Sequence, residues 1–142
     1  MNRIRLRNIR RFKIGKLVRD NIPTDIRARG IGVVERRLNN PEFAHRLKER
    51  LVEEAIDVQN SLSAEEMLEE LCDVFEIMQA LCKACKLPLS QVKKAAQEKS
   101  LQKGSFESKT YIDYIEIGES HPKLEYYLSH PDKYPEILVS ES

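Results

Sequence analysis

Apolar residues recur with helical spacing through the middle of the chain. Residues 43–62 and 67–85 each carry apolar side chains at steps of three and four, as on one face of an amphipathic helix. Asn40, followed by proline and glutamate, predicts the N-cap of the first helix. Ser63-x-x-Glu66 predicts a capping box that starts the second. The pattern therefore predicts an antiparallel helical hairpin that folds back near Ser63.

Shorter elements are predicted on both sides of the hairpin. A short helix near residues 22–29 has a proline in its first turn and a glycine after its end. A third long helix follows, capped by Ser90 and ended by Gly104. Residues 32–38 and 111–117 are candidates for short strands. The predicted fold class is all-α: a hairpin plus a third helix, which assembles into a four-helix bundle by oligomerisation.

Four acidic residues of the hairpin form two matched pairs. Glu54 and Asp57 are spaced i, i+3, and so are Glu70 and Asp73, which puts each pair on one helix face. In the predicted hairpin the two pairs lie level with each other, along the flank of the apolar face. Convergent carboxylates repel one another, so we expect a hard divalent cation between them, Mg²⁺ with Mn²⁺ as the alternative. The competing interpretation is a surface acidic cluster on solvated helices.

The third helix carries a possible counterpart to this metal. Lys99 and Lys103 are spaced i, i+4 on a face that also holds the small residues Ala95 and Ala96. Two lysines on such a face suggest an anion, such as a phosphate chain, that bridges the metal and the ammonium groups. The alternative is that both lysines pair with the acids of the hairpin.

Charge is distributed unevenly along the chain. Residues 1–19 hold eight basic residues and no acidic one, whereas residues 49–76 hold ten acids and one base, Arg50. A basic arm on an acidic body suggests contact with a polyanion such as nucleic acid, or with a neighbouring subunit. Three cysteines without scaffold spacing indicate a reducing, cytoplasmic compartment. No apolar run is long enough to predict a membrane span.

Three blocks of the sequence resemble a known superfamily. The acidic motif at 53–57 and 70–73 resembles the metal signature of the all-α nucleoside triphosphate pyrophosphohydrolases, which include MazG and phosphoribosyl-ATP pyrophosphohydrolase. The segment 16–23, Lys-Leu-Val-Arg-Asp-Asn-Ile-Pro, resembles the opening of a MazG-like subgroup, and residues 99–106 resemble its closing segment. Two positions depart from the pattern: Asp57 stands where glutamate is usual, and Ser105 where glycine is usual.

The resemblance covers about residues 14–117 and implies a MazG-like domain there, between a basic arm at 1–13 and an extension at 118–142. It implies Mg²⁺-dependent cleavage between the α and β phosphates of a nucleotide substrate, with release of a nucleoside monophosphate and pyrophosphate. It also implies a homodimer or homotetramer. The metal ligands would be Glu54, Asp57, Glu70 and Asp73.

The remaining residues take more open roles. Glu53 would be a base or a second-metal ligand, while Lys99 and Lys103 would stabilise charge on the leaving phosphates. Lys16 and Arg19 would either contact phosphate or tie the N-terminal segment to the hairpin acids. The alternative function is a catalytically weak helical module that binds nucleic acid or protein through its basic arm, and a purely structural helical oligomer is a third.

Overall fold

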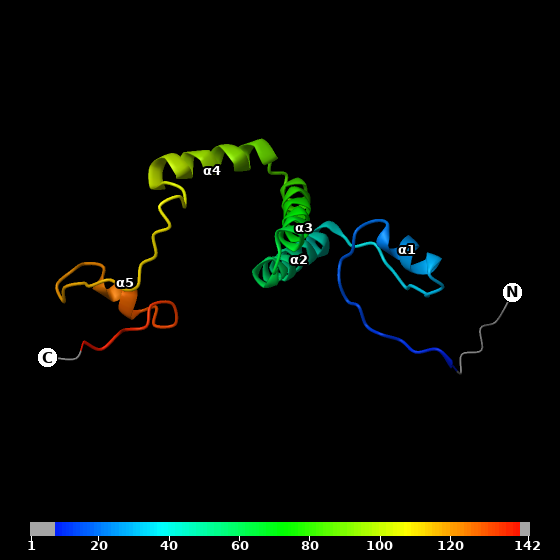
Figure 1. Ribbon diagram of the computed structural model, residues 1–142, viewed down its shortest axis with the longest axis horizontal. Helices are drawn as coiled ribbons and strands as arrows, with labels where there is room; N and C mark the ends of the chain where they lie inside the picture. The colour runs from blue at the N-terminus through cyan, green and yellow to red at the C-terminus, as the bar shows by residue number, and fades with distance from the viewer. Residues whose placement is uncertain (1–7, 140–142) are drawn as a thin grey trace. The chain divides into compact units, whose positions relative to one another are not determined.

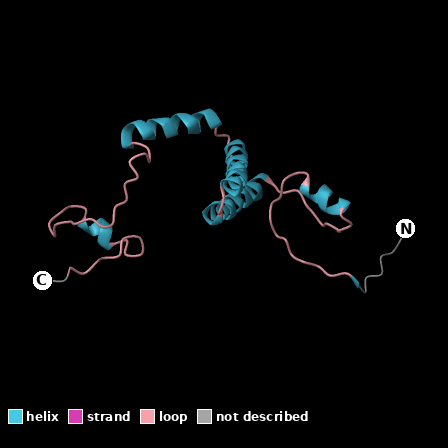
Figure 2. Ribbon diagram, viewed as in Figure 1, coloured by secondary structure: helices cyan, strands magenta, loops and turns pink. Residues whose placement is uncertain are grey.

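The computed structural model describes residues 8–139, which form five helices and no strand (Figure 1, Figure 2). The chain divides into two compact units, Met1–Gln102 and Lys103–Ser142. Residues 1–7 of the predicted basic arm lie outside the described residues. The all-α class is confirmed for the described part of the chain, whereas assembly into a bundle stays a prediction. The helices are α1 Ile22–Ala28, α2 Asn40–Asn60, α3 Ala64–Ala84, α4 Leu89–Lys103 and α5 Leu124–Leu128.

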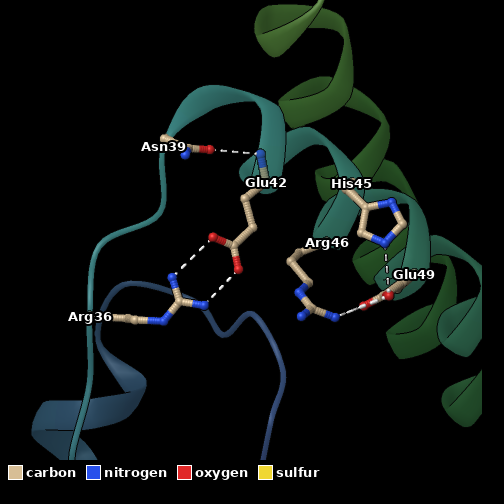
Figure 3. A network of polar contacts seen from close by, with 6 residues as sticks. All are labelled: Arg36, Asn39, Glu42, His45, Arg46 and Glu49. Atoms are coloured by element: carbon tan, nitrogen blue, oxygen red, sulfur yellow. Dashed lines mark hydrogen bonds and ion pairs between the residues drawn. The ribbon is translucent and has the colours of Figure 1, made fainter.

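The start of α2 lies one residue before the predicted cap. Asn39, in extended backbone conformation, is the N-cap, and its side-chain oxygen accepts a hydrogen bond from the backbone N–H of Glu42 at 3.0 Å. Asn40 is already helical, so the prediction that it caps the helix was wrong. Figure 3 shows the cap beside a bidentate ion pair in which Arg36 donates to both oxygens of Glu42, at 3.0 and 2.6 Å. This pair holds the segment before α2 against the first turn of the helix.

Further along the same helix, Figure 3 shows a second group of polar contacts. Arg46 and His45 both reach the carboxylate of Glu49, Arg46 at 2.8 Å and His45 at 3.2 Å. These spacings of three and four residues join consecutive turns on the exposed side of α2. They add support to the helix on the face that does not contact α3.

The turn between α2 and α3 confirms the predicted reversal near Ser63. The Ser63 hydroxyl accepts a hydrogen bond from the backbone N–H of Glu66 at 3.1 Å, which caps α3. The carboxylate of Glu66 accepts in return from the N–H of Leu62 at 2.8 Å, one residue earlier than in a standard capping box. The backbone N–H groups of Glu66 and Leu62 are therefore both satisfied within this turn.

Helices α2 and α3 pack against each other and form the centre of the first unit. The buried apolar residues are Leu47 on α2 and Ile77 and Cys82 on α3. The apolar surface of α3 is wider than α2 covers, because Leu71 and Phe75 remain 48% and 47% exposed. The hairpin alone therefore leaves part of its apolar face uncovered.

The two strand predictions are wrong. Residues 32–38 and 111–117 are irregular, and in the described residues no segment pairs with either of them (Figure 2). A strand needs a neighbouring strand to accept its backbone hydrogen bonds, and propensity for β structure does not supply one. In the first segment, the Val33 carbonyl instead accepts a hydrogen bond from the Arg27 side chain at 3.3 Å.

The third long helix starts two residues earlier than its predicted cap at Ser90 implies. It begins at Leu89, so Ser90 lies within it, and Gly104 follows its last residue with the positive φ of +82° that a C-terminal glycine adopts. It has no buried residue. Among the described residues, no helix has both the length and the apolar character that a membrane span requires.

The second unit contains a small aromatic cluster around α5. The rings of Tyr126, Tyr127 and Tyr134 lie with centroids 5.0 to 6.0 Å apart, and the His130 ring lies 4.7 Å from that of Tyr126. A ring nitrogen of His130 bonds the Tyr126 carbonyl at 2.7 Å. This local cluster gives the unit its own packing.

Candidate metal centre

Glu54 occupies a core position of α2. It follows Leu51 by three residues and precedes Val58 by four, so all three side chains lie on the face that contacts α3. Its exposed fraction is 4%, equal to that of the core residue Leu47. A buried carboxylate at such a position requires a cationic or hydrogen-bonding partner, because desolvation of the charge is costly.

Helix α3 brings a second carboxylate to the same place. Glu70 follows Met67 by three residues and precedes Val74 by four, so it interrupts the apolar seam of α3 as Glu54 interrupts that of α2. One carboxylate oxygen each from Glu54, Asp57 and Glu70 lies within 4.8 Å of the other two. The structure thus brings together three of the four residues that the sequence proposes as metal ligands.

The negative charges act on one another at this site. Desolvation raises the pKa of Glu70, and a hydrogen bond with Glu54 together with the charges of Asp57 and Asp73 raises it further. The Glu70 carboxylate therefore holds its proton more strongly than an isolated glutamate does. A bound cation would relieve this repulsion, since it favours the ionised form of each ligand.

Arg50 is the main counter-charge that the hairpin itself provides. Its guanidinium is forked: Nη1 donates to Glu53 Oε2 at 2.5 Å, and Nη2 donates to Glu54 Oε1 at 2.8 Å. The hydrogen bond from Arg50 lowers the pKa of Glu53, and Lys16 contributes to the same shift. Arg50 was not predicted as a partner of these acids, although its spacing of three and four residues from the two glutamates is the helical signal for such pairs.

The fourth proposed ligand has a different partner. Asp73 Oδ1 accepts a hydrogen bond from Arg19 Nη2 at 2.5 Å, and Asp73 does not belong to the group of three convergent carboxylates. Lys16 Nζ lies 3.5 Å from Glu53 Oε2. Of the two roles considered for Lys16 and Arg19, the structure contains the tie between the N-terminal segment and the hairpin acids.

Lys99 and Lys103, two of the four lysines of α4, are exposed. Lys99 forms no ion pair with the hairpin acids in the part of the chain that the structure describes. Lys103 is the last residue of α4 and the first of the second unit. Neither lysine is thus part of the group formed by Glu54, Asp57 and Glu70.

The donor set fits a small divalent cation. Carboxylate oxygens are hard ligands of the kind that Mg²⁺ and Mn²⁺ prefer. Opposite ligands of one Mg²⁺ lie about 4.1 Å apart, so oxygens within 4.8 Å of one another reach a shared ion with a small change of rotamer. Arg50 leaves Asp57 and Glu70 unpaired among the described ion pairs, and these two carboxylates supply the accessible oxygens.

Comparison with known protein families, with curated proteins and with solved structures finds no match for this chain.

Proposed function

We propose that this chain is a divalent-metal-dependent nucleotide pyrophosphohydrolase that releases a nucleoside monophosphate and pyrophosphate. The observation that carries the proposal is the convergence of Glu54, Asp57 and Glu70 at the α2–α3 seam, with Glu54 and Glu70 at positions where apolar residues would pack. The order of the three sequence blocks that resemble the MazG-like pyrophosphohydrolases supports the choice of substrate class.

Each residue of the site has a role in this proposal. Glu54, Asp57 and Glu70 hold Mg²⁺ or Mn²⁺, and Asp73 completes the set when Arg19 leaves it. The bound cation would neutralise phosphate oxygens and activate a water for in-line attack. Arg50 fixes the rotamers of Glu53 and Glu54, because one guanidinium binds both. Glu53, which shares the Arg50 guanidinium with Glu54, would act as a base or bind a second ion.

Assembly and location are part of the same proposal. Two hairpins would pair into a four-helix bundle, as a homodimer or homotetramer, and cover apolar residues such as Leu71 and Phe75. Lys99 and Lys103 would then stabilise the negative charge of the nucleotide phosphates. Three free cysteines agree with a reducing, cytoplasmic compartment.

A panel of nucleoside triphosphates with Mg²⁺, scored for pyrophosphate against orthophosphate, tests this function. We expect pyrophosphate, and we expect Glu70→Gln to lower its release at least a hundredfold, because the variant removes a charged ligand. Glu69→Gln is the matched control, since Glu69 is an exposed neighbour outside the group of three. Equal activity in both variants, or orthophosphate as the product, would contradict the proposal.

One observation favours a second candidate, a catalytically weak helical module that binds nucleic acid or protein through its basic arm. Arg50 and Arg19 already neutralise Glu54 and Asp73, so ion pairs alone account for two of the four acids. This candidate predicts no thermal shift with Mg²⁺ and a DNA affinity that falls steeply as salt rises.

A further inference from the structure

The N-terminal segment is tied to the acidic hairpin by side-chain contacts. We call residues 16–20 the strap. Lys16 of the strap binds Glu53 of α2, and Arg19 binds Asp73 of α3 across a sequence separation of 54 residues. Both pairs are open to solvent, with 56% of the Arg19 side chain and 37% of the Asp73 side chain exposed. These contacts therefore hold the strap at the rim of the candidate metal centre.

The Arg19 guanidinium and a divalent cation need the same carboxylate oxygens. Asp73 follows Glu70 by three residues, so it lies one helical turn from the convergent group. The hydrogen bond with Asp73 raises the pKa of Arg19, and the charges of Glu76 and Glu54 add to this effect. Arg19 thus lies within the field of the acidic group as well as in contact with Asp73, and an exposed ion pair of this kind is weak.

We propose that Arg19 is a displaceable counter-ion, and that cation binding recruits Asp73 and releases the strap from α3. Release leaves the guanidinium, a donor suited to phosphate oxygens, available beside the loaded site. Arg19 is then a positioning residue that acts through Asp73. This inference rests on the proposed metal centre and adds to it a coupling between cation binding and the position of the strap.

The test measures Mg²⁺ binding to the full chain by calorimetry, and the mobility of residues 16–20 by NMR order parameters of their backbone amides, with and without Mg²⁺. For the wild type we expect lower order parameters, and so a more mobile strap, after Mg²⁺ is added. For Arg19→Gln we expect Mg²⁺ affinity to rise about two- to fivefold, because an exposed competing pair is removed. The strap of this variant should be mobile from the start, and its order parameters should not respond to Mg²⁺.

Two further variants make the result specific. Arg19→Lys keeps the charge and should return the affinity toward wild type. Arg36→Gln removes a bidentate pair with Glu42, far from the acidic group in sequence, and should leave both readouts unchanged. Equal Mg²⁺ affinity in wild type and Arg19→Gln, with a strap whose mobility does not respond to Mg²⁺, would overturn the proposed displacement of Arg19 by the cation. The proposed metal centre would remain. The absence of Mg²⁺ binding in both proteins would remove the metal centre and the displacement together.

Discussion

Glu54 and Glu70 face each other across the seam of the hairpin, each in a position that its helix otherwise fills with leucine, valine or methionine. Glu54 is buried and Glu70 is half-buried, and the charges of Glu54 and Asp57 oppose ionisation of Glu70. Carboxylates at apolar positions lower the stability of this contact, which is a pattern expected of functional sites.

This repulsion predicts that Glu70→Gln stabilises the hairpin in metal-free buffer at neutral pH. A carboxyl group whose pKa is raised by folding binds its proton more tightly in the folded chain, so stability falls as pH rises from the usual pKa of glutamate through the raised value. Glutamine does not ionise, so the variant should not lose stability in this way. Urea unfolding should show a higher midpoint for the variant at pH 7 and a smaller difference at pH 4. Glu69→Gln should match the wild type at both pH values, and a destabilised Glu70→Gln would refute the argument.

Cation binding should raise the thermal stability of the wild type. At a Mg²⁺ concentration about a hundred times the dissociation constant, the expected gain is about 2.7 kcal/mol. Asp57→Asn should lose most of this gain without harming the fold, because Asp57 is exposed. Glu65→Gln, also exposed, serves as the control and should keep the full shift in differential scanning fluorimetry.

The helix cap can be tested by comparing two adjacent asparagines. Asn39→Ala should destabilise the hairpin by about 1 kcal/mol, because it removes the acceptor for the Glu42 N–H. Asn40→Ala should cost little or even stabilise, since alanine has the higher helix propensity. Chemical denaturation of both variants measures the difference, and the reverse order would place the cap at Asn40 after all.

Because the core is small, substitutions at buried and at exposed positions of α2 should differ widely in their effect on the free energy of unfolding. Leu47→Ala should cost about 2–5 kcal/mol, because the side chain is almost fully buried against its neighbours. Val52→Ala, at a position 61% exposed, should stay within about 0.5 kcal/mol of the wild type. A similar loss of stability in both variants would mean that the outer face of α2 is covered in solution.

The uncovered apolar surface of α3 leads to a prediction about assembly. If hairpins pair through it, sedimentation should give a dimer or larger species, and Phe75→Glu should shift the chain toward the monomer. Val34→Glu is a suitable control, because Val34 is fully exposed outside the hairpin. A wild type that sediments as a monomer at micromolar concentration would contradict the proposed bundle.

The sequence predicted most of the helical structure because helix signals are local. The turn at Ser63 and the glycine after α4 act within a few residues, and their predictions agree with the structure to within one or two residues. The prediction of a strand at 32–38 was wrong because strand formation is not local: a strand depends on a partner elsewhere in the chain.

Some features of the candidate site could be predicted from local sequence signals, and others could not. Glu54 and Asp57 share a helix face by spacing alone, and a hairpin with Glu70 on its second helix brings the third carboxylate to them. The pair between Arg19 and Asp73 could not be predicted from spacing, because the two residues are 54 positions apart and belong to different segments. The position of Lys99 likewise depends on how α4 is oriented, which helical periodicity does not encode.

The two hydrogen bonds from the Arg50 guanidinium have a consequence for folding. Because this guanidinium belongs to the same helix as Glu53 and Glu54, the helix carries its own neutralising group from the moment it forms. The α2–α3 hairpin therefore does not depend on a metal ion to neutralise Glu53 and Glu54 as it forms. If the proposed site binds a cation, that binding would follow folding, and a shortage of the metal would leave folded protein that is still able to bind it.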